Sequence, residues 1–416
     1  MRILYVCPDD GIPVLGAKGG AVHVREMIAA LARAGHQVIL AAPMGLKSSA
    51  EEPAALAGEF VEIAPSAATE KMAAGMRSFL GRVECDKSAA RSVRRMLYDN
   101  ELAAALLDRF AGKPPDLIYC RAALLSTAAA QLARATVCPL VVELNAPLAA
   151  EQAAYRSGSL MELAVAAERF LLQAADAVLV VSHALVGHVE ALGVAAERVH
   201  VQPNAIDPAQ FRPGEPDPLL RERLGLGAGP LLGFVGGLKP WHGVDSLPEL
   251  LARLAPRVPG VQLLVVGDGP MRGAMVERLE ACGMAERVVF AGNVAHEAIP
   301  EHIRLFDAAL APYPRPEREF YFSPLKLFEY MGCGAAVVVP RIGQIAEMVE
   351  DGCTGLLHAP GDMNALAKAC ERVLMDRELK QRLGNAAAAR IHAQHTWDQS
   401  AMRVIALAGQ PEKAAA

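Results

Sequence analysis

Short, strongly apolar segments alternate with helical segments along nearly the whole chain. Residues 3–7 and 177–181, for example, are continuous apolar runs, whereas residues 161–174 carry the spacing of a helix. Parallel strands that are buried on both faces have such runs, and a helix usually connects two of them. The alternation therefore predicts an α/β fold with doubly wound parallel sheets.

The expected strands fall into two series. The first lies at residues 3–7, 37–41, 117–120, 140–143, 177–181 and 199–202, and the second at 231–235, 262–266, 287–290, 308–311 and 335–339. A chain of 416 residues is too long for one ordinary core, so each series predicts a domain. Residues 207–218 are rich in proline and polar residues, which is typical of a linker. We expect domains at 1–207 and 208–395, with a last helix and a loose tail over 396–416.

The composition is that of a soluble α/β protein. Hydrophobic residues make up 53% of the chain and charged residues 21%, and the net charge of −5 argues against a general nucleic-acid-binding protein. The eight cysteines show no CxxC pair and no metal-like spacing, so we expect reduced thiols and no metal site. The chain begins with too short an apolar run for a signal peptide, and no run reaches the roughly 18 residues of a membrane span. These features predict a cytoplasmic protein of enzyme size.

The segment 322–332 has the features of an anion site at the start of a helix. Ser323 is a favourable N-cap, and Pro324 suits the first helical position, where its missing N–H costs nothing. The helix that follows would direct free N–H groups and its positive dipole end at an anion. Lys326 and Glu329 lie three residues apart and therefore share a helix face. This arrangement predicts a nucleoside diphosphate site, with the lysine at the phosphates and the carboxylate at the ribose.

A loop that contains glycines, residues 14–20, lies between the first strand and a helix expected at about 21–34. Gly19 and Gly20 allow a ligand to approach the backbone, and the helix start favours an anion. An ordinary strand-to-helix turn is the alternative. The glycine spacing is not that of a dinucleotide site, and no GxxxxGK[ST] sequence occurs, so neither a dinucleotide-binding enzyme nor a P-loop nucleotidase is predicted.

Several segments together resemble the family 4 (group 1) glycosyltransferases of the GT-B fold. They occur in the family's order and spacing along nearly all of the chain. They are Gly19-Gly20, Val181-Ser182 followed by 203–207 and Phe211, the segments 234–243, 266–270 and 320–331, and Asp351-Gly352 with 354–357. One such segment is weak support, whereas the ordered set is specific.

The resemblance implies transfer of a sugar from a nucleotide-diphosphate sugar to an acceptor, with retention of configuration at the anomeric carbon. It implies two Rossmann-like domains that face each other across a cleft, with the donor mostly on the C-terminal domain and the acceptor mostly on the N-terminal one. The last helix would cross back to the N-terminal domain. Because the leaving diphosphate would itself take the acceptor proton, neither a metal nor another cofactor is expected, and cations and helix N-termini would stabilise the developing charge.

The resemblance also assigns roles to residues of this sequence. The donor would contact Gly19, Gly20, Gly236, Gly237, Tyr321, Phe322, Ser323, Pro324, Leu325 and Glu329, and the residues expected near the reacting atoms are Lys326, Lys239, His242, Asn145 and Glu143. Glu329 would bind the ribose hydroxyls through charge-assisted hydrogen bonds.

The sequence departs from the family at several of these positions. Tyr321 stands where the family has the first glutamate of E-x7-E. Gly237 and His242 replace the arginine and lysine of its G-R-x-x-x-K-G segment, and we expect Lys239 to supply the lost charge. Asn145 stands where many relatives carry a histidine, and an amide can orient a hydroxyl but cannot act as a base.

Glu143, Glu151 and His23 are the remaining titratable candidates in the N-terminal half. Glu143 ends a strand, and the carboxyl ends of parallel strands border the crevice in which ligands of open α/β sheets bind. A helix cap or a loop brace is the alternative for the two carboxylates, and a solvated helix position is the alternative for His23.

Other functions remain open at this point. A sugar-nucleotide epimerase or a phosphorylase on the same scaffold would also bind phosphate groups, and a non-catalytic nucleotide-binding subunit would keep the fold without turnover. The acceptor is open among sugars, lipid-linked acceptors and small molecules, in polysaccharide, glycolipid or glycoside biosynthesis. The cations between residues 77 and 113 suit a peripheral contact with the inner face of the membrane or a solvated helix face, and the interrupting acidic residues favour the latter.

Overall fold

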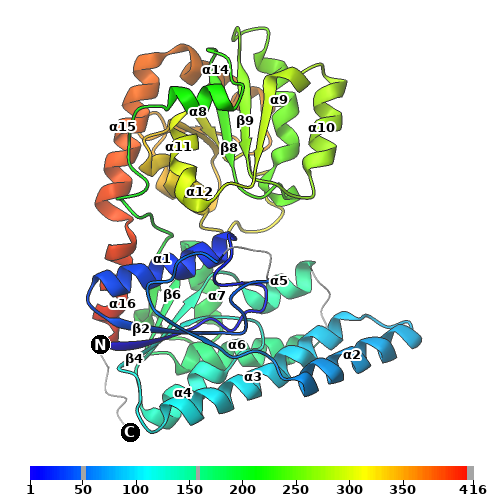
Figure 1. Ribbon diagram of the computed structural model, residues 1–416, viewed down its shortest axis with the longest axis vertical. Coiled ribbons are helices and arrows are strands. Elements are labelled where there is room, and N and C mark those ends of the chain that lie inside the picture. Colours follow the sequence, from blue (N-terminus) through cyan, green and yellow to red (C-terminus); the bar gives the residue numbers. More distant parts are fainter. Residues whose placement is uncertain (48–52, 156–159, 410–416) are drawn as a thin grey trace. The chain divides into compact units, whose positions relative to one another are not determined.

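The structure, a computed structural model, describes residues 1–47, 53–155 and 160–409. The chain forms two compact units, each with one parallel sheet covered by helices (Figure 1). The first unit consists of Met1–Pro203 with Trp397–Ala416, and the second of Asn204–Thr396. The chain thus returns to the first unit for its last helix.

The first unit is built on a seven-stranded sheet in which each strand is parallel to its neighbours. Its order is β3-β2-β1-β4-β5-β6-β7, and its strands are β1 Arg2–Val6, β2 Gln37–Ala42, β3 Glu59–Glu62, β4 Leu117–Arg121, β5 Leu140–Leu144, β6 Ala177–Val180 and β7 Val199–Val201. This is a doubly wound order. The predicted strands of the first series are all present. The prediction lacks β3, because glutamates at both ends leave it only two apolar residues.

Helices of the first unit cover the two faces of this sheet. They are α1 Gly19–Arg33, α2 Ala67–Arg82, α3 Ser88–Phe110, α4 Ala128–Thr136, α5 Leu148–Tyr155, α6 Met161–Ala174, α7 Val186–Ala191 and α16 Trp397–Ala408, with 3-10 turns η1 His183–Leu185 and η2 Ala196–Arg198. The helix α6 has the bounds that its apolar spacing predicts. Helix α16 packs beside α1, and α2 runs along α3 (Figure 1).

The second unit repeats the same design with six parallel strands. Its order is β10-β9-β8-β11-β12-β13, and its strands are β8 Leu231–Val235, β9 Gln262–Val266, β10 Val288–Gly292, β11 Ala308–Leu310, β12 Val337–Pro340 and β13 Leu356–His358. Two of the predicted strands have the predicted bounds, at 231–235 and 262–266. The short edge strand β13 is missing from the predicted series.

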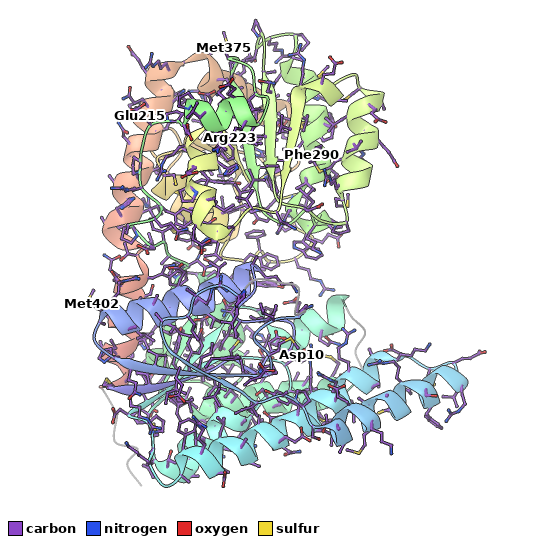
Figure 2. All side chains as sticks on the ribbon, viewed as in Figure 1. Asp10, Glu215, Arg223, Phe290, Met375 and Met402 are labelled. Atoms are coloured by element: carbon purple, nitrogen blue, oxygen red, sulfur yellow. The ribbon has the colours of Figure 1, made fainter. Side chains whose placement is uncertain are left out.

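Helices and turns of the second unit fill both faces of its sheet. They are α8 Pro218–Arg223, α9 Leu247–Leu254, α10 Arg272–Ala281, α11 Ile299–Arg304, α12 Leu325–Gly332, α13 Gly343–Met348, α14 Met363–Met375 and α15 Arg377–Gln394, with 3-10 turns η3 Pro240–His242, η4 Val244–Ser246, η5 Ala285–Arg287 and η6 His296–Ala298. Side chains of β8 alternate between two buried apolar clusters. Leu231 and Val235 belong to one, and Leu232 and Phe234 to the other. Figure 2 shows the side chains of each unit between its sheet and its helices.

The strand order of each sheet reverses beside its first strand. The reversal lies between β1 and β4 in the first unit and between β8 and β11 in the second. Ligands of open α/β sheets bind outside the carboxyl ends of the strands at such a reversal. The loops after these four strands are therefore the positions where the fold itself places ligand sites. Among the helices that the structure describes, none is long and apolar enough to cross a membrane.

Candidate functional site

The loops after β8 and β9 lie against each other at the switch point of the second unit. The N–H of Gly236 donates to the carbonyl of Val266 (2.8 Å). Gly267 has a φ of 126°, and a Cβ atom there would lie 2.2 Å from the carbonyl oxygen of Gly236. A side chain at Gly236 itself would lie 2.9 Å from Nζ of Lys326. Glycine at these positions lets two backbones and a lysine ammonium occupy the same small space.

Lys326 lies in the first turn of α12, and its ammonium is buried over aromatic rings. Nζ is 4.1 Å from the ring centre of Phe234 and 5.8 Å from that of Tyr313. It has no hydrogen-bond partner among the residues that the structure describes. Burial lowers the pKa of Lys326 to about 7, although the carboxylate of Glu329 opposes the shift. A buried ammonium without a partner is costly unless an anion binds to it, so this position has the character of an anion site.

His242 lies beside this lysine in the turn η3. Its Nδ1 is 2.6 Å from the carbonyl oxygen of Gly237. A carbonyl only accepts, so Nδ1 carries the proton and donates it. Burial, followed by the charges of Lys326 and Lys239, lowers the pKa of His242 to about 4. The imidazole is therefore neutral at neutral pH, with Nε2 as an acceptor, and an anion nearby would favour its protonated form.

Glu329 lies one turn further along α12, and its carboxylate is bound by His296. The Nε2 of His296 donates to Oε1 at 2.9 Å, and Glu329 is only 7% exposed. His296 is absent from the residues predicted from the sequence. Its position in η6, just after the carboxyl end of β10, is the signal that could have found it.

The start of α12 differs from the prediction in one respect. Ser323 is not the N-cap. Pro324 is the N-cap, in an extended conformation, and the helix begins at Leu325. Asn204 makes two hydrogen bonds to Ser323 instead. The backbone N–H of Asn204 donates to Oγ of Ser323 (2.9 Å), and Nδ2 of Asn204 donates to the backbone carbonyl of Ser323 (2.5 Å).

Helix α12 is also tied to the central strand of its sheet. The hydroxyl of Tyr330 accepts the N–H of Val235 (2.6 Å) at the end of β8. This buried bond fixes the position of α12 relative to the glycine turn that follows β8. Lys326 and Glu329 are therefore held by a rigid element on one side and by that turn on the other.

Aromatic side chains extend from His242 along the loop before α12. Tyr313 contacts the ring of His242 edge-on (5.8 Å) and that of Phe320 (5.1 Å). Phe322 continues the row, with its ring 5.4 Å from Phe320 and 4.5 Å from Tyr321. Trp241, at the other end, is 56% exposed. The second unit thus gathers Gly236, Gly237, Lys239, His242, Tyr321, Phe322, Ser323, Pro324, Leu325, Lys326 and Glu329 at the ends of β8 and β11.

In the first unit, Glu143 at the end of β5 is the centre of a buried hydrogen-bond network. One carboxylate oxygen accepts from His23 (2.8 Å) and Tyr119 (2.5 Å). The other accepts from Arg121 (2.6 Å) and from the amide of Asn145. Burial alone would raise the pKa of Glu143, but His23 and Arg121 hold it well below its usual range. Glu143 is therefore an ionised anchor that positions Arg121 and Asn145.

Gly19 and Gly20 open α1 in the first unit. Arg25 of that helix is buried and donates to the carbonyls of Val14 (2.9 Å) and Gly16 (2.6 Å). These two hydrogen bonds hold the loop before α1 against that helix. Gly19 and Gly20 belong to the first unit, whereas the residues around Lys326 belong to the second.

Two arginines of α3 are paired with carboxylates of the first unit. Arg94 of α3 donates to Glu70 (2.7 Å) and to Asp10 (2.5 Å), which lies in the loop after β1 (Figure 2). Arg109 donates to Glu59 (2.7 Å). Within residues 1–47, 53–155 and 160–409, no group of three or more His, Cys, Asp and Glu side chains is placed to hold a metal ion.

Comparison with known proteins identifies the family of the chain. Residues 17–210 match the family Glycosyltransferase Family 4, and residues 229–376 match Glycosyl transferases group 1. Glycogen synthase of Mycobacterium tuberculosis (strain CDC 1551 / Oshkosh) is 26% identical over 420 residues, which cover 95% of this chain and 92% of the relative. Alpha-D-kanosaminyltransferase of Streptomyces kanamyceticus is 32% identical over 169 residues, which cover 41% of this chain and 42% of the relative.

A solved structure shares the fold over nearly the whole chain. Anabaena Alr3699/HepE in complex with UDP aligns with a TM-score of 0.70 and 19% sequence identity, over 98% of this chain and 99% of that chain. The likeness agrees with the two doubly wound sheets, and the predicted fold class is confirmed. Together, the two family matches extend over most of both units. The chain therefore belongs to the group 1, family 4 glycosyltransferases and is a glycosyltransferase of the GT-B fold.

Proposed function

We propose that this enzyme transfers a sugar from a nucleotide-diphosphate sugar to an acceptor hydroxyl and that its second unit holds the donor. The observation that carries the proposal is the environment of Lys326. Its ammonium is buried over two aromatic rings and has no hydrogen-bond partner in the described part of the chain. A diphosphate would supply the missing anion, and the N-terminal end of α12 would add its dipole.

The same charges suit the chemistry of transfer. As the bond between the anomeric carbon and the diphosphate breaks, negative charge grows on the leaving phosphate. Lys326 and the first N–H groups of α12 are fixed beside that position before the reaction, so they stabilise the charge without rearrangement. A phosphate beside His242 would raise the pKa of its imidazole and add another donor, and Lys239 lies on the same turn.

We propose that Glu329 binds the ribose of the donor. His296 occupies one of its carboxylate oxygens, which leaves the other for a ribose hydroxyl. A charge-assisted bond of this kind is short and directional, so the His296 contact would fix the rotamer of Glu329 before the nucleotide arrives. The ribose and diphosphate contacts would then come from the same helix, three residues apart.

Retention of configuration and independence of a metal ion belong to the same proposal. In a front-face transfer, the acceptor hydroxyl approaches on the side from which the diphosphate leaves. The new bond between acceptor oxygen and anomeric carbon forms as the old bond breaks, and the departing phosphate takes the acceptor proton. This route requires donors around the phosphate rather than a carboxylate base. Lys326 and α12 provide such donors, whereas the carboxylate of Glu143 is already fully hydrogen-bonded.

The relatives guide the choice of donor and acceptor. The solved structure of HepE contains UDP, one relative is named for glycogen, and another is named for the kanosaminyl group. By analogy, we propose a hydroxyl of a sugar, a lipid-linked sugar or a small glycoside as the acceptor, in polysaccharide, glycolipid or glycoside biosynthesis. UDP-sugars are the first donors to test.

A product assay tests the proposal. The purified chain is incubated with UDP-, GDP-, ADP-, CDP- and dTDP-sugars and a panel of acceptors, and NMR reports the product and its anomeric configuration. Release of nucleoside diphosphate that depends on an acceptor, with the donor's configuration in the product, is expected. An altered free nucleotide sugar without an acceptor would indicate an epimerase. Turnover that requires free phosphate would indicate a phosphorylase, and binding without turnover would indicate a non-catalytic subunit.

We also propose that the enzyme works in the cytoplasm without stable membrane contact through α2 and α3. Arg94 and Arg109 bind carboxylates of the protein, so they are not available to lipid phosphates. The exposed Phe79 and Arg82 lie three residues apart on one face of α2, and the guanidinium of Arg82 lies over the Phe79 ring, 5.9 Å from its centre, so this cation has a partner within the protein. Flotation with anionic vesicles is expected to leave the protein unbound, and co-flotation would contradict the proposal.

A further inference from the structure

An open groove lies along helix α2, in the part of the first unit where α2 and α3 run side by side (Figure 1). Its volume is about 490 Å³, and the residues that line it are Ala74, Arg77, Ser78, Gly81, Arg82 and Lys87. All of these residues belong to α2 except Lys87, which immediately precedes α3. The groove therefore belongs to the first unit and is separate from the site around Lys326 in the second.

The groove carries positive charge without a counter-charge. Arg77, Arg82 and Lys87 line it, and none of its lining residues is acidic. No ion pair joins these three cations to a carboxylate in the described part of the chain, whereas Arg94 and Arg109 of α3 are paired. Like charges around one groove repel each other, so an anion that enters it is attracted by all three.

Two contacts hold Arg82 at the groove. Its Nη1 donates to Oγ of Ser78 at 3.0 Å, and its guanidinium lies 5.9 Å from the centre of the Phe79 ring. A guanidinium has five N–H donors, so most of them stay available to a ligand. The position of this cation is therefore set before a ligand arrives, which lowers the entropy cost of binding.

Gly81 lets Lys87 fold back across α2. A Cβ atom at position 81 would lie 3.1 Å from Cε of Lys87 and 3.5 Å from its Nζ. The ammonium thus lies over the last turn of α2, where the negative end of the helix dipole favours a cation. A large side chain at position 81 would push Lys87 away and fill the groove. The glycine is therefore what brings the third cation to this site.

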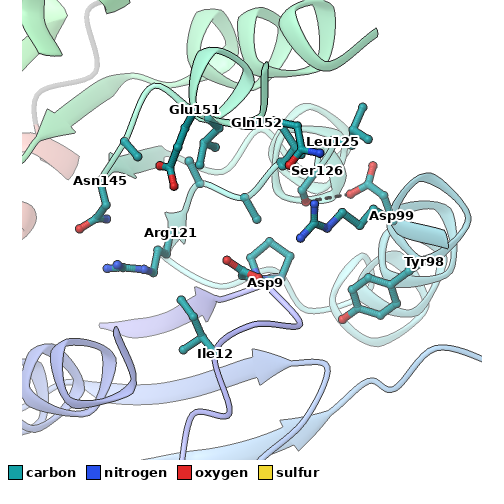
Figure 3. A pocket seen from close by; sticks show the side chains of 17 residues that line it. Asp9, Ile12, Tyr98, Asp99, Arg121, Leu125, Ser126, Asn145, Glu151 and Gln152 are labelled. Carbon is teal, nitrogen blue, oxygen red and sulfur yellow. Dashed lines mark hydrogen bonds between the residues drawn. The ribbon is translucent and has the colours of Figure 1, made fainter. Parts of the chain in front are cut away.

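The cavity at the switch point of the first unit has a different balance of charge (Figure 3). Asp9, Asp99 and Glu151 line it together with Arg95 and Arg121. Carboxylates among the cations of that cavity compete with an anionic ligand, whereas the groove on α2 offers cations and a hydroxyl alone. Of the two, only the groove has a lining that selects for an anion.

We propose that the groove binds the phosphate group of a small soluble ligand, as a second anion site besides the donor site. Arg77 and Arg82 each present a planar fork of donors that fits two phosphate oxygens, and Lys87 adds a point charge. The hydroxyl of Ser78 accepts from Arg82 and donates its own proton to the ligand. A phosphate monoester carries up to about two negative charges at neutral pH, so it suits three cations better than a carboxylate does.

A soluble ligand fits this groove better than a lipid headgroup does. Glu84 and Asp86 lie exposed in the turn between α2 and α3, close in sequence to Lys87. These carboxylates would repel a flat anionic surface that meets the end of the helix pair, whereas a small phosphate can enter the groove along α2. The phosphate chemistry is the same for both sources, so the experiment has to separate them.

The test is calorimetric titration of inorganic triphosphate at low salt into the full chain carrying Lys326→Met, so that the donor site contributes little. Gly81→Leu fills the groove without removing a charge. Its matched control is Gly75→Leu, because a Cβ atom at Gly75 meets nothing within 4 Å and Gly75 lies on the same helix outside the lining. Arg77→Gln is paired with Lys71→Gln, since Lys71 is an exposed cation of α2 that does not line the groove.

We expect triphosphate to bind, with Gly81→Leu and Arg77→Gln each weakening it about threefold to tenfold and both controls leaving it unchanged. No binding, or equal weakening by the two leucine variants, would overturn the site. Flotation with vesicles of phosphatidylcholine and phosphatidylglycerol, without binding of triphosphate, would assign the groove to lipid and overturn the soluble ligand. Nucleoside diphosphate binding is measured with Lys326 intact. It should persist in Gly81→Leu, and its loss there would contradict a second, separate site.

Discussion

The ammonium of Lys326 lies 4.1 Å from the centre of the Phe234 ring, buried at the start of α12 and beside the glycine turn that follows β8. Cation–π attraction offsets part of the cost of burying this charge, and an anion would offset the rest. The relationship brings a strand end, a glycine turn and a helix start together at one position.

Replacing Lys326 by Met is expected to stabilise the protein while weakening its binding of nucleoside diphosphate. Without ligand, the variant should unfold with a free energy at least about 1 kcal/mol higher, because an unpaired buried charge is replaced by an apolar chain of similar shape. Chemical denaturation with and without nucleoside diphosphate measures both effects. The exposed Lys368 of α14 gives the control Lys368→Met, which should change neither quantity. A destabilised Lys326→Met variant would show that the ammonium has a partner in the free protein.

Donor binding should take up protons above neutral pH. The folded pKa of Lys326 is about 7, and bound phosphate would raise it toward its ordinary value of 10.5. At pH 8, binding is therefore expected to draw most of one proton, with less uptake at pH 6. Calorimetry in buffers of different ionisation enthalpy measures the number of protons taken up on binding. Uptake that persists in Lys326→Met would assign the proton to another group, such as His242.

The lowered pKa of Lys326 also makes the free energy of unfolding depend on pH. Between pH 7 and 10.5 the unfolded chain holds more protons at Lys326 than the folded chain does, so this residue makes the unfolding free energy rise with pH across that window. The rise should be absent from Lys326→Met. Urea unfolding at several pH values, with wild type and variant compared, checks the difference between the two slopes.

Loss of His296 should weaken the ribose contact alone. His296→Ala frees the carboxylate of Glu329, and we expect nucleoside diphosphate affinity to fall about threefold to tenfold. Inorganic pyrophosphate, which has no ribose, should bind both proteins equally in competition experiments. Equal weakening of both ligands would place His296 at the phosphates.

Glu143→Gln is expected to destabilise the first unit by about 3 kcal/mol, because it leaves Arg121 without its buried counter-charge. The folded pKa of Glu143 lies below its ordinary value of 4.5, so its contribution is complete above that pH and is lost as the pH falls further. Acid unfolding of the wild type should therefore be steeper than that of the variant. Acid-unfolding curves of equal steepness for the wild type and Glu143→Gln would contradict the role of Glu143 as an ionised anchor.

The sequence predicts the fold well where local and tertiary preferences agree. Continuous apolar runs such as that of β8 become strands buried on both faces. Short edge strands are not visible in the sequence. In β3, only Phe60 and Val61 lie between glutamates, and pairing with β2 decides the conformation. Ser323 is also predicted wrongly as an N-cap, because the backbone of Asn204 competes successfully for its hydroxyl.

The residues of the candidate site also differ in how well the sequence alone reveals them. Lys326 and Glu329 are recognisable from the sequence because their spacing on one helix is a local property. His296 is not, because its importance arises from a partner on a distant segment of the chain. Glu143 lies between these cases. Its place at a strand end is visible in the sequence, but its role as an anchor follows from four bonds that only the fold creates.

The most direct test of the central claim is calorimetric titration of UDP, GDP, ADP, CDP and dTDP into the wild type and Lys326→Met, with Lys368→Met as control. We predict that at least one nucleotide binds the wild type and the control equally and binds Lys326→Met at least about tenfold more weakly. Absence of binding by every nucleotide, or equal binding to all three proteins, would contradict a donor site built around Lys326.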